Sequence, residues 1–275
     1  MNAMPLSSVA IARIHKPTRE EFEQHFLSPQ KPCVITGAIE DWRALSAWTI
    51  NYLKTNIGDK AVPCRVSRND YFDNYQAHKQ IKLAIFLDWI LANEQQNAWD
   101  IIFQKKNKTK YFVGSLDIPT YFSEILADIT IPNYFDSHLL TSQNLWIGQG
   151  NNRVNLHYDF FHNLNAQILG KKHWFIFPPE QSSCLYPHPW YTKFFWCSQV
   201  NINQPDLQKF PKFSEITPLE VITNPGEILF LPSGWWHSPV GIGTNIAVNF
   251  WWRMTLKEIV NFLSLKFLNI HPHII

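Results

Sequence analysis

The sequence has few cysteines and no long apolar run, and each shortage excludes a class of protein. Its four cysteines among 275 residues form no Cys-x-x-Cys pair and fit neither a zinc ribbon nor a dense disulfide framework, so we expect reduced thiols. No run approaches the roughly 18 apolar residues of a membrane-spanning helix, and residues 1–13 lack the basic and apolar segments of a secretory signal. These absences predict a cytoplasmic protein without a membrane partner.

Charge of one sign is also scarce. The formal net charge is only +2, which argues against a protein committed to neutralising nucleic-acid phosphates. The densest basic cluster, residues 105–110, carries four lysines and is expected to form a solvent-exposed loop. The alternative is contact with an anionic or nucleic-acid substrate, because clustered lysines bind phosphates without sequence preference.

Aromatic residues, by contrast, are plentiful, with 12 tryptophans and 20 phenylalanines. Such residues supply core area and favour strands, and an apolar content of 45% is enough to bury one large core. From residue 144 onward, short apolar runs are broken by Gly, Asn and Pro in the rhythm of a β-barrel or sandwich. The pattern favours one large β-rich domain with additions.

Three residues have the spacing of a metal site. His157 and Asp159 lie two apart, so on a strand both side chains point to the same side. His237 follows a second predicted strand, residues 228–231, that begins after a turn signal. Two imidazoles and one carboxylate can occupy one face of an octahedral ion, which is the ligand set of non-haem iron(II) oxygenases. Taken alone, a His-x-Asp pair can equally be a solvated pair on a surface loop.

A longer ordered set of residues surrounds these three. It comprises Asn163, residues 166–172, 177–179, 185–187, 225–232, 234–237 and 249–251. From Trp146 to Trp252 the chain thereby resembles the JmjC-type, cupin-like hydroxylases, and among them the asparaginyl hydroxylase that inhibits hypoxia-inducible factor and its small relatives. The resemblance implies a mainly β, double-stranded β-helix (jelly-roll) core. It also implies Fe(II) at His157, Asp159 and His237, with 2-oxoglutarate and O2 as co-substrates.

The whole chain, residues 1–275, is expected to be a single domain in three parts. Residues 1–109 would form a mostly helical amino-terminal cap, residues 110–252 the jelly-roll core, and residues 253–275 a carboxy-terminal helix. Thr255 and Glu258 fit a capping box at the start of that helix. Its apolar surface is wider than one face, so we expect a homodimer through it.

Several local patterns predict individual elements. Residues 18–26 and 49–58 are predicted to be helices capped by threonines at their first positions, and residues 79–91 a helix with one apolar face. Residues 32–36 are predicted to be a strand. Gly170 and Lys171 separate two apolar runs, which predicts a two-residue hairpin with glycine at the positive φ.

The resemblance also assigns residues to the co-substrate. Lys172 would bind the distal carboxylate of 2-oxoglutarate, because a buried dicarboxylate needs a cationic partner, whereas Lys171 should point outward. Asn163 and Asn249 would lie near the co-substrate, although Asn163 could equally be a satisfied core amide. Trp251 would form a wall of the pocket or simply pack in the core.

Two positions depart from the family pattern. Many relatives carry a hydroxyl residue three positions before the first histidine, where this chain has Val154. A tyrosine donor is expected from an earlier strand, and Tyr111 and Phe112 compete for that position, of which only Tyr111 has a hydroxyl. Asn144 or Asn155 could complete the co-substrate site instead.

The expected activity is hydroxylation of a protein or peptide side chain, with succinate and CO2 as co-products. A tRNA nucleoside is the second candidate substrate, supported by the lysine cluster and by family analogy. A different class of function, a metal-binding cupin without oxygenase activity, is favoured by Val154. The histidines at 162, 173 and 188 lack a carboxylate at strand spacing and are not expected to bind the metal.

Overall fold

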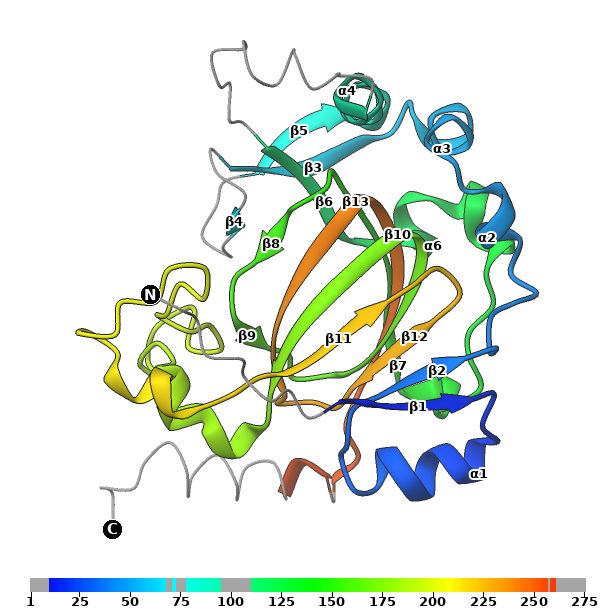
Figure 1. Ribbon diagram of the computed structural model, residues 1–275. Helices are drawn as coiled ribbons and strands as arrows, with labels where there is room; N and C mark the ends of the chain where they lie inside the picture. Colours follow the sequence, from blue (N-terminus) through cyan, green and yellow to red (C-terminus); the bar gives the residue numbers. More distant parts are fainter. Residues whose placement is uncertain (1–9, 68–70, 73–77, 95–109, 257, 261–275) are drawn as a thin grey trace.

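The computed structural model describes residues 10–67, 71–72, 78–94, 110–256 and 258–260. These residues fold around one large, strongly bent sheet (Figure 1). Its strands follow the order β1 (Ala12–His15), β2 (Cys33–Thr36), β12 (Ile228–Leu231), β10 (His162–Phe177), β13 (Trp236–Trp252), β7 (Leu140–Gly148), β6 (Lys110–Asp117), β3 (Ala61–Ser67) and β5 (His78–Lys82). Beside this path, β11 (Leu219–Thr223) pairs with β10, β8 (Arg153–Val154) and β9 (His157–Tyr158) pair with β13, and β4 (Tyr71–Phe72) pairs with β8.

The two longest strands, β10 and β13, form the spine of the fold. They pair antiparallel from His162 opposite Trp252 to Phe177 opposite Trp236. One half of β13 also pairs with β7, and the other half with β8 and β9. Both strands are curved, so the sheet bends over on itself (Figure 1). This is the jelly-roll arrangement that the sequence predicts.

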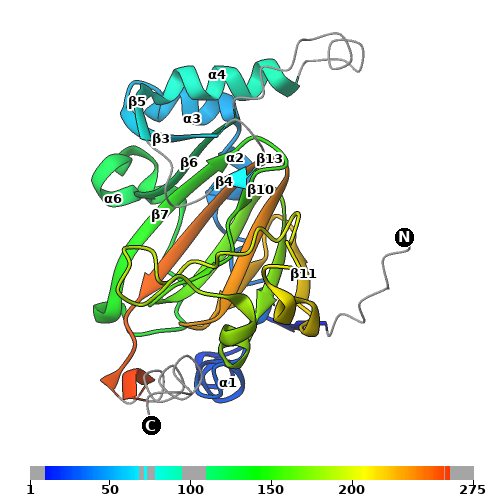
Figure 2. The same cartoon turned by 90° about the vertical axis from the view of Figure 1, so that its left-hand side faces the viewer.

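Helices cover the outer surface of the sheet. They are α1 (Arg19–Phe22), α2 (Arg43–Ala47), α3 (Ile50–Ile57), α4 (Leu83–Glu94) and α6 (Ile118–Tyr121), with a π-helical turn at Glu23–Leu27 and 3-10 turns at Ser123–Asp128, Ser137–Leu139, Pro179–Leu185 and Pro211–Glu215. Figure 2 shows α3 and α4 over one end of the sheet and α1 at the other. The largest apolar cluster joins these helices to the sheet through residues such as Leu53, Phe86, Val113, Leu145 and Phe250.

The amino-terminal helix begins where the sequence places it. The Thr18 hydroxyl accepts a hydrogen bond from the Glu21 amide at 3.1 Å, and the Thr18 amide donates to the Glu21 carboxylate at 2.8 Å. Thr49 caps α3 in a similar way, because its hydroxyl accepts from the Tyr52 amide at 3.1 Å. These local caps satisfy amide groups that a helix start leaves without partners.

The amino-terminal part is less helical than expected from its pattern. Residues 79–82 belong to β5 and pair with β3, so the helix predicted from residue 79 begins only at Leu83. β1 and β2 extend the sheet at one edge, and β3 and β5 extend it at the other. Residues 110 and 252, proposed as limits of the core, are the first residue of β6 and the last of β13. The division into an amino-terminal cap, a jelly-roll core and a carboxy-terminal helix is a proposal.

The predicted hairpin at Gly170 is wrong. β10 runs through this position without a turn, and the pairing register with β13 shifts on either side of Leu169. Gly170 does have the positive φ, 69°, but uses it at an irregularity of the pairing, where it alone stands opposite residues 243–245 of β13. Lys172 therefore lies on the same strand as Asn163.

The carboxy-terminal helix is described only at its start. Residues 256 and 258–260 are helical, and the Thr255 amide donates to the Glu258 carboxylate at 2.7 Å, as a capping box requires. Residues 261–275, where the sequence predicts the remainder of the helix, and residues 105–109 of the lysine cluster lie outside the described residues. Within the described part of the chain, no helix is both long and apolar enough to span a bilayer. The four cysteines are free thiols, three of them buried.

Candidate metal centre

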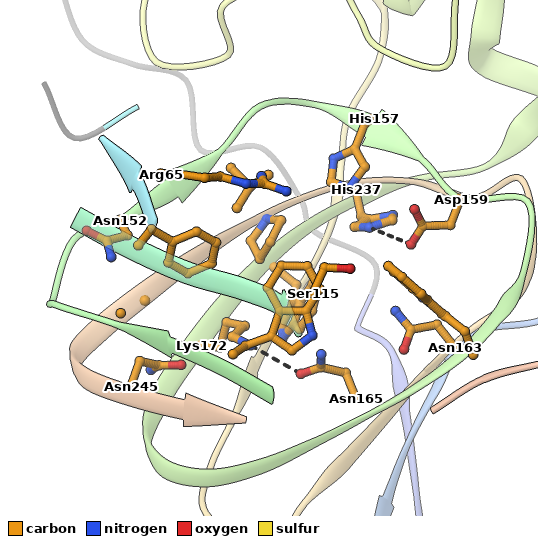
Figure 3. A pocket seen from close by; sticks show the side chains of 18 of the residues that line it. Arg65, Ser115, Asn152, His157, Asp159, Asn163, Asn165, Lys172, His237 and Asn245 are labelled. Carbon is orange, nitrogen blue, oxygen red and sulfur yellow. Dashed lines mark hydrogen bonds and ion pairs between the residues drawn. The ribbon is translucent and has the colours of Figure 1, made fainter. Parts of the chain in front are cut away.

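Strand pairing brings His157, Asp159 and His237 together. His157 in β9 stands opposite His237 at the start of β13, and Asp159 follows β9 directly. The ligand atoms of the three residues lie within 4.8 Å of one another, and His237 Nε2 is 3.7 Å from Asp159 Oδ2 (Figure 3). The cluster that the spacing predicts is therefore formed.

Backbone carbonyls orient both imidazole rings. The Nδ1 atom of His157 lies 2.7 Å from the Asn155 carbonyl oxygen, and the Nδ1 atom of His237 lies 3.0 Å from that of Trp235. A carbonyl can only accept, so each Nδ1 carries the proton and donates it. Each Nε2 lone pair is then left for a ligand. This tautomer, held by the second ring nitrogen, is the arrangement of metal-binding histidines.

A glycine turn ties the Asp159 loop to the beginning of β13. The Asp159 carbonyl accepts hydrogen bonds from the Gly234 amide at 2.9 Å and from the Ser233 hydroxyl at 3.3 Å. Gly234 has φ +81°, a conformation that side-chain-bearing residues rarely adopt. The Pro-Ser-Gly turn in this way fixes His237 relative to Asp159.

Burial changes the proton affinities of this cluster. Burial lowers the pKa of His157 well below its usual value, and the neighbouring His237 lowers it further. Burial raises the pKa of Asp159, against the opposing effects of His237 and the Trp251 indole. A carboxylate held beside two imidazoles in a largely buried site carries a desolvation cost, and a divalent cation would compensate it. The donor set fits iron(II) and other divalent first-row metals.

The three ligands stand at one part of a cavity of about 320 Å³. Lys172 is buried in the same cavity, with Nζ 3.2 Å from Asn165 Oδ1 and 5.2 Å from the centre of the Trp174 ring. Burial lowers the pKa of Lys172 to about 7. No carboxylate of the described residues pairs with its ammonium group. The exposed Lys171 points outward, as predicted.

The other predicted residues divide into two groups. Asn163 and Trp251 line the cavity. Asn249 is fully buried behind them, where it accepts a hydrogen bond from Trp146 Nε1 at 2.6 Å and donates one to Asn163 Oδ1 at 3.1 Å. Asn249 therefore orients cavity residues without lining the cavity itself.

The structure corrects the placement of Tyr111. Its ring stacks on Trp89 of α4 at 4.1 Å, on the helix-covered side of the sheet. Phe112, the next residue, faces the cavity instead. Since neighbouring strand residues point to opposite sides, only one of the two can reach the cavity, and it is the one without a hydroxyl.

Some cavity residues escape sequence reasoning. Asn165 could have been found, because it lies two residues beyond Asn163 on the same strand face. Ser115 faces the cavity through an irregularity in β6 that no local pattern reveals. Phe194 and Trp196 come from the long segment between β10 and β11, and the Trp196 carbonyl accepts from the Tyr158 amide at 3.0 Å, beside the metal ligands.

Two of the remaining histidines have partners away from the cluster. His162 Nε2 donates to Glu258 Oε1 at 3.1 Å, and His173 Nε2 donates to Glu220 Oε2 at 2.8 Å. Neither belongs to the metal-binding group found among the described residues. His188 likewise lies outside that group.

Comparison with known proteins places the chain in a family. The cupin-like domain family matches residues 19–258. The chain belongs to this JmjC-type, cupin-like family. It is 30% identical over 250 residues to lysine-specific demethylase 8 of Xenopus tropicalis, covering 90% of this chain and 53% of that protein.

Two human relatives of this cupin-like chain match over more of their length. The human tRNA wybutosine-synthesizing protein 5 is 27% identical over 257 residues, 90% of this chain and 79% of the relative. The human bifunctional peptidase and (3S)-lysyl hydroxylase JMJD7 is 26% identical over 270 residues, 86% of this chain and 82% of the relative. The chain spans little more than half the length of the demethylase-named relatives that it matches.

Proposed function

We propose that this JmjC-type protein is an Fe(II)- and 2-oxoglutarate-dependent oxygenase. The observation that carries the proposal is one cavity with two complementary features. Three groups that can hold a metal ion converge in it, and the Lys172 ammonium lies buried in it with no carboxylate partner among the described residues. A metal site alone would suit many cupins. A metal site with an unpaired cation in the same cavity suits a ligand that is a metal chelator and an anion at once.

In this proposal His157, Asp159 and His237 hold the iron, and Lys172 binds the distal carboxylate of the co-substrate. The reaction converts R–H, 2-oxoglutarate and O2 into R–OH, succinate and CO2, so one oxygen atom enters the alcohol and the other enters succinate. The bound iron supplies the activation of O2. The protein supplies position, because both imidazoles are held by backbone carbonyls.

Aromatic residues shape the space beside the metal. Trp251, Phe194 and Trp196 line the cavity, and Trp196 is joined through its carbonyl to the strand that carries His157. Such side chains exclude water and present flat apolar walls to a substrate.

The first proposed substrate is a side chain of a protein or peptide. The similarity to proteins named lysine-specific demethylase 8 and (3S)-lysyl hydroxylase supports this class. A tRNA nucleoside is the second proposal, supported by the similarity to tRNA wybutosine-synthesizing protein 5 and by the lysines of residues 105–110. The alternative of a metal-binding cupin without oxygenase activity is supported by Val154, which brings no hydroxyl to the cavity.

Succinate formation tests the oxygenase proposal. Purified protein with Fe(II), ascorbate, O2 and 2-oxoglutarate would be assayed with a peptide pool and with a tRNA pool, beside His157→Ala and Lys172→Ala. We expect turnover that both substitutions abolish and that one pool stimulates. Tight Fe(II) binding without 2-oxoglutarate binding or turnover would instead support the non-oxygenase cupin.

A cytoplasmic location and a homodimer through residues 255–270 remain proposals. The apolar stripe of that segment supports the dimer. Light scattering that gives the mass of a monomer at micromolar concentration would contradict it.

A further inference from the structure

Ser115 has an unusual backbone for a residue in a cavity wall. Among the described residues that line the cavity, it alone has a positive φ, 59°. This left-handed conformation is disfavoured for residues other than Gly, Asn and Asp. Backbone strain of this kind is retained where the surrounding structure needs it, and it gathers at functional sites.

A β-bulge produces this conformation. Gly114 and Ser115 of β6 together stand opposite the single residue Trp146 of β7. A Cβ atom on Gly114 would come within 2.5 Å of Cε3 of Trp146, so the glycine makes room for the indole. The extra residue in β6 is accommodated by turning the backbone at Ser115.

The bulge changes which way Ser115 points. Val113 and Leu116 both pack in the apolar core beneath the helices, whereas Phe112 and Ser115 both line the cavity. In a regular strand, residues three apart point to opposite sides. Phe112 and Ser115 share the cavity side only because the bulge adds a residue between them. The strained backbone thus serves to bring the serine hydroxyl inside.

That hydroxyl is chemically distinctive in its surroundings. Ser115 carries the only hydroxyl among the described residues that line the cavity. Val154 and Phe112, which occupy the two positions where a hydroxyl donor was expected, form an apolar cluster with Trp146. In the view of Figure 3, Ser115 stands between Lys172 and the metal ligands, all of which line the same cavity.

A carboxylate bound by Lys172 could accept a further hydrogen bond from such a hydroxyl. Its ammonium has one hydrogen-bond acceptor among the described residues, Asn165 Oδ1 at 3.2 Å. A carboxylate offers about four lone-pair sites, of which one lysine fills few, and a hydroxyl donor adds directional contact. The opposite end of a 2-oxo acid would be occupied by the metal. The distal carboxylate is therefore the group that needs a further donor.

We propose that Ser115 donates a hydrogen bond to the distal carboxylate of the 2-oxo dicarboxylate bound by Lys172. It thereby replaces, from a bulge in β6, the hydroxyl that Val154 cannot supply. This inference rests on the proposed function.

Equilibrium binding tests the inference without relying on turnover. Ser115→Ala and Ser115→Gly both remove the hydroxyl, and glycine also relieves the backbone strain, so at least the second variant should fold well. Binding of 2-oxoglutarate and of 2-oxobutanoate, which lacks the distal carboxylate, would be titrated anaerobically into Fe(II)-loaded protein. Ser142→Ala is the matched control, because it lies on the neighbouring β7 but does not line the cavity.

We expect 2-oxoglutarate to bind about tenfold more weakly to both Ser115 variants, the loss typical of one hydrogen bond to a charged group. The affinities for 2-oxobutanoate and for Fe(II) should not change. Val154→Thr, which adds a hydroxyl at the family's position, should restore 2-oxoglutarate affinity in the Ser115→Gly background. Equal weakening of both 2-oxo acids, weaker Fe(II) binding, or no change at all would overturn the inference.

The wild-type titration separates the two levels of the argument. Failure of the wild-type protein to bind 2-oxoglutarate would overturn the proposed function and this inference with it. Tight binding by the wild-type protein, together with equal affinity in the Ser115 variants, would overturn the inference alone.

Discussion

His237 Nε2 lies 3.7 Å from Asp159 Oδ2, although the two residues come from distant parts of the chain. The β9–β13 pairing and the hydrogen bond from the Gly234 amide to the Asp159 carbonyl hold them in this position. The Nδ1 atoms of His157 and His237, which face away from the site, each donate a hydrogen bond to a backbone carbonyl. The ligand geometry is therefore set before any metal binds, which reduces the ordering cost of binding.

Loss of one ligand should remove metal binding. His157→Ala and Asp159→Ala should each weaken Fe(II) affinity by more than about a hundredfold. Loss of a residue that only hydrogen-bonds to a metal ligand already lowers metal affinity roughly 10–100-fold, and loss of the ligand itself should cost more. Isothermal titration under anaerobic conditions measures the change. His173→Ala is the matched control, since His173 pairs with Glu220 outside the cluster, and it should bind Fe(II) like the wild type. An unchanged affinity in either ligand variant would show that the metal binds elsewhere.

Lys172 should make the stability of the ligand-free protein depend on pH. Burial holds its pKa at about 7, whereas in the unfolded chain a lysine titrates near about 10.4. Between these values the unfolded chain binds a proton that the folded protein does not, so the free energy of unfolding should rise as pH increases from about 7 to about 10.

Two lysine variants isolate this effect. Lys172→Met should remove its share of the rise, measured by urea unfolding at several pH values, whereas Lys171→Met should not, because Lys171 is exposed. The same rise in both variants would mean that Lys172 keeps an ordinary pKa.

Gly234→Ala should lower both stability and metal affinity. A side chain at φ +81° costs about 1–2 kcal/mol, and relaxing that strain would disturb the amide that holds the Asp159 loop. Gly226→Ala is the comparison, because Gly226 has φ +86° but does not contact the metal ligands. Urea unfolding should show similar losses for both, and Fe(II) titration a loss for Gly234→Ala alone. Equal Fe(II) affinities in the Gly234→Ala and Gly226→Ala variants would show that this turn does not position the metal ligands.

Glu258 should stabilise the folded protein at neutral pH and lose that contribution in acid. Burial acts to raise its pKa, but hydrogen bonds from His162 and Thr255 outweigh that effect and hold the pKa at about 2. Since an unfolded glutamate titrates near about 4.3, the stabilisation is complete above that pH and is lost as pH falls toward about 2.

The Glu258→Gln variant tests this contribution. It should unfold about 2 kcal/mol more easily at neutral pH, and its stability should fall less between pH 4.5 and pH 2 than that of the wild type. Glu215→Gln, at an exposed position, serves as the control. A parallel loss of stability with pH in Glu258→Gln and wild type would contradict the assignment.

Much of the site could be predicted because its signals are local. The alternation of a strand places His157 and Asp159 on one side, and it also predicts that Lys171 and Lys172 point in opposite directions. The cap at Thr18 depends on residues only three positions apart. Each of these relations spans few residues, so the sequence contains the whole of it.

The sequence predictions were wrong where the local structure depends on residues far away in the chain. A glycine with positive φ suits either a hairpin or an irregularity within a strand, and at Gly170 the pairing of β10 with β13 on both sides selects the irregularity. The apolar residues from position 79 onward have helical spacing, but residues 79–82 form a strand because they pair with β3. Between Tyr111 and Phe112, the face of β6 that meets α4 decides which side chain enters the cavity.

By itself the sequence determined the family and, through that resemblance, the jelly-roll class and the three residues of the candidate metal centre, because the motifs that carry the resemblance are read directly along the chain. Only the tertiary structure decided how the end of the cavity around Lys172 is built. Whether Tyr111, Asn249 or Ser115 reaches that space depends on bulges and strand registers. Those are set by pairing between residues far apart in the chain, which no local pattern records.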